Sequence, residues 1–147
     1  MKKDFRHVPV FTVALAALVA FGALACSDAA TDPSAASDAT AATIRGDELA
    51  ARLGAGDAPL ILDVRTPEEY ETGRVPGAIN IPHTELAARL DELGPGARDH
   101  EVVVYCESGG RAAVAEALLR DAGYGRIVHL EGDMSAWRRE QRPCENC

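Results

Sequence analysis

Short apolar runs alternate with helical patterns over the last two thirds of the chain. LILDV at 60–64 and EVVVY at 101–105 are rich in branched aliphatic residues and bounded by turn residues, a pattern typical of buried strands. IVHL at 127–130 predicts a third strand, and AINI at 78–81 predicts a fourth that Pro82 ends.

The segments beside these runs carry apolar residues at helical spacing. Thr66 followed by Pro67 favours a helix start, and Gly123 favours a helix end. Alternating strands and helices predict an α/β domain whose parallel sheet has helices on both faces. Ligands bind such sheets at the carboxyl ends of the strands, where Cys106 lies. The predicted helices are 47–53, 84–93, 111–122 and 134–140.

The N-terminus has a different character. Residues 1–7 contain three basic side chains, and residues 8–25 form an uncharged apolar run that ends in small residues. This layout predicts a secretory signal peptide over residues 1–25. A permanent membrane anchor is the alternative, but Pro9 and many alanines disfavour it, and a span needs ~20 apolar residues.

GALAC at 22–26 resembles the bacterial lipobox, in which small and aliphatic residues precede a lipid-modified cysteine. Acyl chains on Cys26 would tether the protein to the periplasmic side of a membrane that the chain does not cross. Ala23 stands where leucine is more usual, and 23–25 also fits an ordinary cleavage site, so a soluble periplasmic or secreted form is the alternative. Ser27, rather than aspartate, follows Cys26 and favours the outer membrane.

Residues 26–43 are low in complexity, rich in Ala, Ser, Thr and Asp, and predict a flexible tether. The folded domain is then 44–142, followed by a short tail at 143–147. The chain has 15 basic and 23 acidic residues, and loss of 1–25 leaves 12 and 22, a net charge of −10. This charge disfavours nucleic acid or an acidic lipid surface as a partner.

Cys106 opens a loop between a predicted strand and the helix at 111–122. Such a loop gathers backbone N–H groups without helical partners at the positive end of a helix dipole, which binds anions and favours a thiolate. Gly109 and Gly110 are expected to let the backbone curl inwards, and Arg111 adds a permanent charge. A buried structural cysteine is the alternative, but it needs no such loop.

CESGGRA at 106–112 resembles the active-site loop of the rhodanese (sulfurtransferase) family. LILDVRTPEEYETGRVPGAINIP at 60–82 and LEGDMSAW at 130–137 resemble two further motifs of the family, in the expected order. The resemblance spans nearly everything from 44 to 142. It implies a five-stranded parallel sheet flanked by helices, with the fifth strand near 43–44.

The resemblance implies that Cys106 attacks the outer sulfur of thiosulfate or a persulfide and becomes a persulfide, which a thiol or cyanide discharges. Arg111 matches the arginine that closes the family's loop and would orient an anionic donor. Asp63 and Arg65 match its Asp-Val-Arg motif; they either brace the sheet or loop or form an ordinary surface ion pair. The loop residues expected to surround the substrate are Glu107, Ser108, Gly109 and Gly110.

Three residues depart from the family's pattern. Glu107 stands where thiosulfate-using members often have a basic residue, and beside a dianion it would repel, which predicts that thiosulfate is a poor donor. Arg74 replaces a common histidine, and Asp133 replaces the second glycine of the last motif. Neither is expected to touch the nucleophile.

Cys144 and Cys147 form a C-x-x-C pair in the tail. A passive disulfide, two idle thiols, a redox couple and a resolving thiol for Cys106 are all open. A zinc site is disfavoured because no second pair of ligands is present. Trp137 and Tyr105 are predicted to lie in the core. His83, His100 and His129 are expected to be surface or structural residues, and Glu68, Glu69 and Glu71 a solvated acidic helix face.

An exported sulfurtransferase without a cofactor is therefore the leading hypothesis. Its partners would be a small sulfur donor, a thiol acceptor, a membrane through the lipid anchor, and a periplasmic redox protein. One alternative is a non-catalytic sulfur-relay or protein-interaction module. Another is a phosphatase or arsenate reductase of related fold, but only four residues separate Cys106 from Arg111, fewer than a tetrahedral oxyanion needs.

Overall fold

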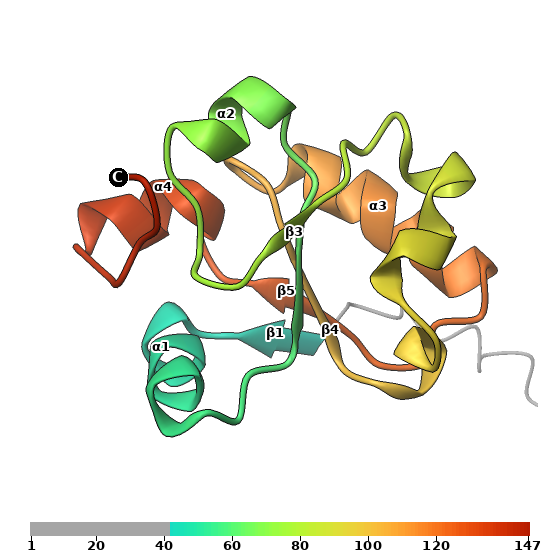
Figure 1. Cartoon of the computed structure of the whole chain (residues 1–147), viewed down its shortest axis with the longest axis horizontal. Helices are drawn as coiled ribbons and strands as arrows, with labels where there is room; N and C mark the ends of the chain where they lie inside the picture. The colour runs from blue at the N-terminus through green and yellow to red at the C-terminus, as the bar shows by residue number, and fades with distance from the viewer. Residues whose placement is uncertain (1–41) are drawn as a thin grey trace, which may run out of the picture. The chain divides into compact units, whose positions relative to one another are not determined.

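The computed structural model describes residues 42–147 (Figure 1). The predicted signal peptide, Cys26 and most of the predicted tether lie outside these residues. The strands are β1 (Ala42–Ile44), β2 (Leu60–Asp63), β3 (Ile79–Asn80), β4 (Val102–Tyr105) and β5 (Ile127–Leu130). They form one sheet in the order β1-β5-β4-β2-β3, and all neighbours are parallel. This confirms the predicted α/β fold, including a fifth strand near residue 44.

Four α-helices accompany the sheet: α1 (Gly46–Ala55), α2 (Pro67–Glu71), α3 (Gly110–Asp121) and α4 (Asp133–Arg139). As predicted, α2 begins at Thr66-Pro67. Gly123, with φ of +86°, follows the end of α3 and donates its N–H to Arg120 O. None of the helices within residues 42–147 is long and apolar enough to span a bilayer.

The α-helix predicted at 84–93 is wrong. The segment forms two 3₁₀ turns, η1 (Leu86–Ala88) and η2 (Leu90–Leu93), and a third, η3 (Ala97–Asp99), follows. Arg89 leaves helical geometry between the first two turns, with φ of −122°. The 3₁₀ turns still bury Leu86 and Leu93, so the apolar spacing that predicted a helix is satisfied without one.

Alternate strand residues pack on opposite faces of the sheet, as the pleat requires. One face packs against α3 and the 3₁₀ turns, and the other packs against α1 and α4 (Figure 1). Tyr105 and Trp137 are buried on the second face, as predicted. The first face includes Leu62, Val64, Val102 and Val104, and the second includes Ile61, Val103 and Leu130.

The order of the strands sets the position of the cysteine loop. From β2 the chain passes outwards to β3, whereas from β4 it passes in the opposite direction to β5. The carboxyl ends of β2 and β4 are therefore the point where the connections diverge, the usual place for a ligand in such sheets. Cys106 follows β4 directly at this point.

Candidate active site

The backbone of Cys106 is held by the start of α4. Cys106 N–H donates to Asp133 Oδ1 at 2.8 Å, and Met134 N–H donates to Cys106 O at 3.1 Å. The expectation that Asp133 does not touch the nucleophile's residue is therefore wrong. The two residues lie far apart in sequence, and the fold brings them together because β5 ends just before α4.

The Cys106 side chain is buried beneath its own loop, and the residue is 1% exposed. Its Sγ accepts a hydrogen bond from Gly109 N–H at 3.1 Å. Gly109 has φ of +96°, and a Cβ there would lie 3.3 Å from Asp133 Oδ2, so this position requires glycine. Gly110 has neither restriction, and the expectation that both glycines shape the turn holds for Gly109 alone.

Glu107 points toward α4. Its carboxylate accepts hydrogen bonds from Ser135 Oγ at 2.9 Å and from Arg138, and Ser135 N–H donates to Glu107 O at 3.2 Å. Buried Arg65 lies on its other side, with Nη1 3.7 Å from Glu107 Oε2. The charge of Glu107 is thus balanced by two arginines. Ser108 is exposed at the outer part of the loop.

Arg111 closes the loop against α2. Its Nη1 and Nη2 donate to the two carboxylate oxygens of Glu69 at 2.5 and 2.8 Å. Glu69 also caps α2, because Thr66 N–H donates to Glu69 Oε2 at 3.0 Å while Glu69 N–H donates to Thr66 Oγ1. The bonds from Arg111 lower the pKa of Glu69 to about 2, and Glu69 raises the pKa of Arg111. Glu69 is therefore a partner of the loop rather than part of a solvated acidic face.

Asp63 and Arg65 form a buried ion pair beside the loop. Asp63 accepts from Arg65 Nη2 at 2.6 Å, from Nε at 3.0 Å and from Arg65 N–H at 2.9 Å. Arg65 Nη2 also donates to Gly73 O at 2.7 Å. Burial alone works to lower the pKa of Arg65, but Asp63 outweighs it and raises the pKa, so the guanidinium stays charged. The surface-pair alternative for Asp63 and Arg65 is excluded.

A second buried polar network lies behind the loop. Asp133 Oδ2 is 3.2 Å from His129 Nε2, and His129 Nδ1 is 2.5 Å from Glu116 Oε1. Asp133 and Glu116 are buried, and the two carboxylates raise the pKa of His129 to about 10. His129 is thus a structural residue, and its distance of 13 residues from Glu116 in the chain gives no local signal of their contact.

The C-terminal cysteines lie apart from this network. Cys144 and Cys147 form a disulfide bond. Between them, Glu145 exchanges backbone hydrogen bonds with Arg74, both at 3.0 Å, and its carboxylate binds Arg74 Nε at 2.9 Å. The tail is thus fixed to the segment before β3. A redox or resolving role of the pair stays a prediction.

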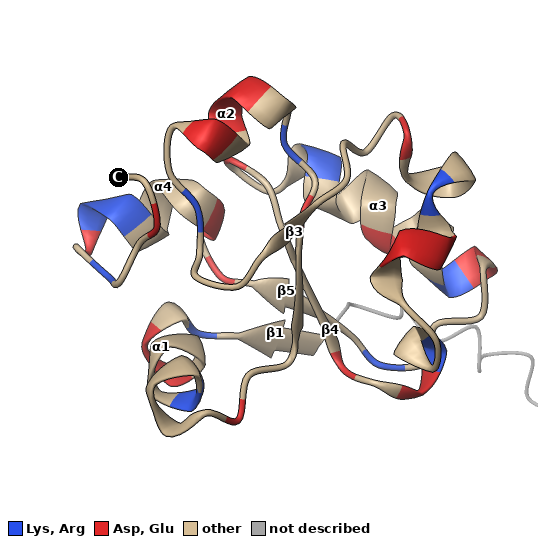
Figure 2. Cartoon of the chain, viewed as in Figure 1, with Lys and Arg blue, Asp and Glu red and all other residues tan. Residues whose placement is uncertain are grey.

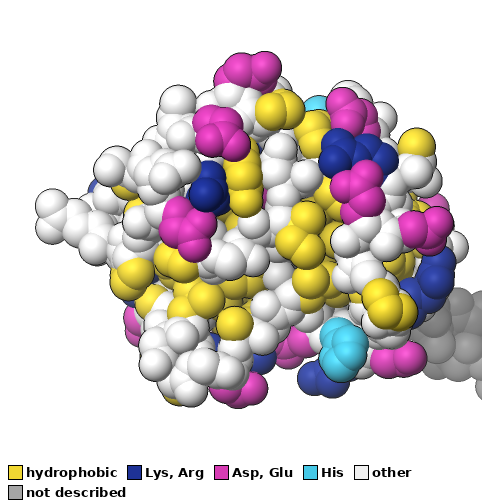
Figure 3. Space-filling model, viewed as in Figure 1, with side chains coloured by type: hydrophobic (Ala, Val, Ile, Leu, Met, Phe, Trp, Pro, Cys, Tyr) yellow, Lys and Arg dark blue, Asp and Glu magenta, His cyan; other side chains and the backbone are white. Residues whose placement is uncertain are grey.

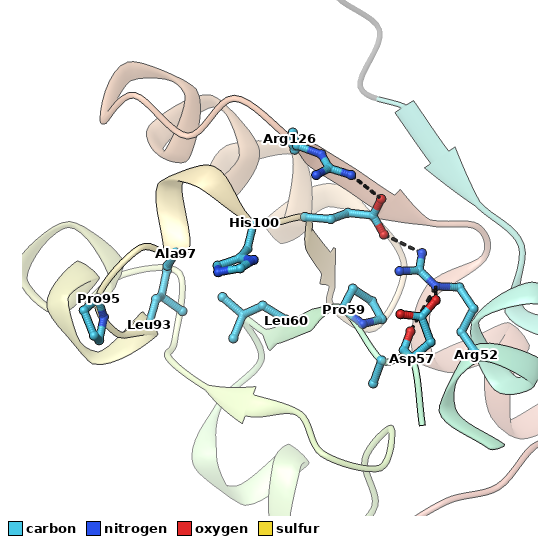
Figure 4. Close-up of a pocket in the computed structure, with 11 residues that line it drawn as sticks. Arg52, Asp57, Pro59, Leu60, Leu93, Pro95, Ala97, His100 and Arg126 are labelled. Carbon is cyan, nitrogen blue, oxygen red and sulfur yellow. Dashed lines mark hydrogen bonds and ion pairs between the residues drawn. The ribbon is translucent and has the colours of Figure 1, made fainter. Parts of the chain in front are cut away.

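A pocket of about 520 Å³ lies at the other end of the strands from Cys106, at the amino ends of β2 and β4 (Figure 4). It contains His100 and a Glu101 carboxylate that binds Arg52 at 2.5 Å and lies 3.8 Å from Arg126. The pocket contains no nucleophile and is remote from Cys106. Within residues 42–147, no group of three or more His, Cys, Asp or Glu side chains is arranged to hold a metal ion.

Charged side chains surround the loop on both sides. Acidic residues gather on α2, and basic residues on the last turn of α4 (Figure 2). Figure 3 shows apolar side chains in the middle of one face with charged side chains spread around them. Among the described residues, Val114 on α3 is the exposed large apolar side chain.

The chain matches known proteins over most of the described residues. Residues 46–140 match the family model of the rhodanese-like domain. A sulfurtransferase of Allochromatium vinosum is 37% identical over 100 residues, which are 68% of this chain and 91% of that protein. Thiosulfate sulfurtransferase 16, chloroplastic, of Arabidopsis thaliana is 34% identical over 91 residues, or 56% of this chain and 76% of that protein.

The fold is also found among solved structures. The crystal structure of a rhodanese-related protein from Thermoplasma volcanium superposes with a TM-score of 0.62 and 32% identity, over 72% of this chain and 99% of the other. Two further relatives are longer, and the chain covers only 39% and 28% of their length. The match over residues 46–140 and the similarity to sulfurtransferases show that this chain belongs to the rhodanese-like domain family.

Proposed function

We propose that this protein is a sulfurtransferase in which Cys106 carries sulfur as a persulfide. The Cys106 thiolate attacks the outer sulfur of the donor, and the donor's S–S bond breaks with its electron pair leaving on the donor fragment. A thiolate or cyanide then attacks the outer sulfur of the persulfide and releases the Cys106 thiolate. The two steps together only move sulfur between nucleophiles, so neither consumes an oxidant or a cofactor.

The hydrogen bond from Gly109 N–H to Cys106 Sγ carries this proposal, because it aims a fixed donor at the reacting sulfur. Cys106 is 1% exposed, and only four residues separate it from Arg111. Such a small enclosure suits one added sulfur atom better than a tetrahedral phosphate or arsenate. This favours sulfur transfer over the hydrolysis of phosphate esters.

The charges beside the loop favour a persulfide donor over thiosulfate. Arg111 is paired with Glu69, and Arg138 is paired with Glu107. Neither arginine offers an unbalanced charge to a dianion, whereas the reacting end of a persulfide carries at most one negative charge. We therefore expect glutathione persulfide to load Cys106 faster than thiosulfate does.

Mass spectrometry tests the reaction class. Exposure to glutathione persulfide should add one sulfur, about 32 Da, to the peptide that contains Cys106. Cys106→Ser should lose both this adduct and turnover, while hydrolysis of an aryl phosphate stays at background in both proteins. Equal sulfur transfer by the serine variant, or aryl phosphate hydrolysis that requires Cys106, would refute the proposal. Loading without release to any small thiol or to cyanide would favour a dedicated protein acceptor.

The same proposal includes a location outside the cytoplasm. The sequence of residues 1–26 supports export and lipidation at Cys26, and 26–43 supports a tether. A periplasmic redox protein would then supply the acceptor thiol. In cells, the parent should fractionate with membranes and incorporate labelled fatty acid, and Cys26→Ala should lose the label. A parent that is soluble, unlabelled and cleaved after Ala25 would contradict the anchor.

A further inference from the structure

Asp133 accepts a hydrogen bond from a backbone N–H group that has no partner within the sheet. Cys106 directly follows β4. Pairing between β4 and β5 ends earlier, at Val104, which is the last β4 residue in register with β5. The Cys106 N–H donates to Asp133 Oδ1 at 2.8 Å instead of to a neighbouring strand. The next residue, Met134, donates its N–H to Cys106 O. The start of α4 therefore satisfies both backbone groups of the nucleophile's residue.

The backbone of Asp133 is itself in an unusual conformation. Its φ is +53°, a left-handed value that residues other than glycine rarely adopt, and the preceding Gly132 has φ of +72°. A glycine at 133 would adopt this conformation more easily, yet the chain has a carboxylate there. Because both oxygens of that carboxylate are engaged, the side chain has a specific use that offsets the strain.

The carboxylate of Asp133 is held in turn by two other elements. His129 on β5 contacts Oδ2 of Asp133 with one ring nitrogen and Glu116 on α3 with the other. The same helix α3 begins at the end of the cysteine loop. Asp133 Oδ2 also lies 3.3 Å from the position that a Cβ would occupy on Gly109, the residue whose N–H donates to Sγ. The network thus joins both ends of the loop.

We propose that Asp133, held by His129 and Glu116, is a positioning residue that fixes the backbone of Cys106 for sulfur transfer. Its role in turnover rests on the function proposed above. With the Cys106 N–H bound to Asp133, the loop turns at Gly109 so that Gly109 N–H faces the sulfur. A buried hydrogen bond to a charged acceptor is strong enough to hold this geometry.

His129 is the basic member of the network that it forms with Asp133 and Glu116. The groups that face it are Glu116 and Asp133, and its neighbours in the sheet are Thr43 on β1 and Val104 on β4, which carry no charge. The carboxylates raise the pKa of His129 to about 10, so the imidazolium persists across the neutral range. Loss of Glu116 would lower that pKa, while Asp133, the larger of the two contributions, would still hold it above the usual histidine value of about 6.5.

The test compares full-length variants by two rates: sulfur loading of Cys106 by glutathione persulfide, and alkylation of Cys106 by iodoacetamide, mapped to its peptide. Asp133→Gly should slow both by about tenfold, because the loop loses its fixed anchor. Asp133→Asn keeps an acceptor oxygen and should stay within about threefold of the parent at pH 7. Glu131→Gln is the matched control. It removes a charge from an exposed neighbour that binds Thr43, and should leave both rates unchanged.

A pH profile separates positioning from simple structural support. For Glu116→Gln, the measured quantity is its alkylation rate divided by the rate of the parent at the same pH. This ratio should fall in a step between about pH 6.5 and 10, because His129 loses its proton there in the variant but keeps it in the parent. Parental rates in a folded Asp133→Gly, or a flat ratio for Glu116→Gln, would overturn the proposal. If Cys106 takes no sulfur in the parent but Asp133→Gly still slows alkylation tenfold, the proposed function fails and the positioning role stands.

Discussion

Two arginine–carboxylate pairs flank the cysteine loop and differ mainly in their exposure to water. The side chains of Asp63 and Arg65 are both 0% exposed, whereas those of Glu69 and Arg111 are 33% and 28% exposed. Removing one partner of a buried pair leaves a charge that water cannot reach, but at a partly exposed pair water replaces much of the lost interaction. An arginine paired with a carboxylate therefore stabilises the fold at one position and sets the charge beside the cysteine loop at the other.

The largest effect is expected at the buried pair. Arg65→Met should lower the free energy of unfolding by about 3–5 kcal/mol, because buried Asp63 loses the guanidinium and keeps only the backbone N–H of residue 65, while Gly73 O loses a donor. Urea unfolding at pH 7 measures this change. The double variant Asp63→Leu with Arg65→Met is the matched control and should recover part of the loss. If Arg65→Met unfolds at the parental urea concentration, the pair does not hold the fold.

An intermediate effect is expected at His129, which is less buried than Arg65. Its folded-state pKa is raised above the unfolded value, so its contribution is complete below about pH 6.5 and is lost as the pH rises through about 10. His129→Gln should therefore lower the free energy of unfolding by about 2 kcal/mol at pH 6 and by much less near pH 10.5. Thermal unfolding of both proteins across this range checks the prediction. A difference that grows with pH would contradict the assignment of an imidazolium.

The smallest effect on stability is expected at the exposed pair. Glu69→Gln should change the free energy of unfolding by less than about 1 kcal/mol, since the amide oxygen still accepts the Thr66 N–H that caps α2. It should, however, release the charge of Arg111 and raise kcat/KM for thiosulfate by about threefold to tenfold at low salt.

The control for Glu69→Gln is Glu68→Gln, which removes the same charge from an exposed residue of the same helix. It should leave the thiosulfate rate close to the parental value. The rate with a persulfide should change less than the rate with thiosulfate in Glu69→Gln. An equal gain for both donors, or no gain for thiosulfate, would mean that Arg111 does not face the donor.

Much of the fold and the cysteine loop could be predicted because their signals are local. Branched aliphatic runs mark β2 and β4, and a Cys followed by Gly109 and an arginine marks the loop between a strand and a helix. The segment at 84–93 was mispredicted because its apolar spacing suits a helix and two 3₁₀ turns equally well. Local spacing cannot report the break in backbone geometry at Arg89.

The partners of the loop could not be predicted because they come from distant segments. Glu69 lies 42 residues before Arg111, and Asp133 lies 27 residues after Cys106. A partial signal was present: Thr66 and Glu69 fit the capping-box spacing, which turns the glutamate back toward the helix start and away from the solvated face. The replacement of a family glycine by Asp133 was a second signal, but its meaning required the end of β5 to be known.

Transfer of an isotopically labelled sulfur through Cys106 tests the central claim most directly. The full-length protein is loaded with a persulfide whose outer atom is sulfur-34, freed of excess donor, and then mixed with a thiol acceptor. The Cys106 peptide should gain about 34 Da on loading and return to its original mass as the label appears in the acceptor's persulfide. Label that reaches the acceptor equally well in Cys106→Ser, or that never leaves Cys106, would contradict the account.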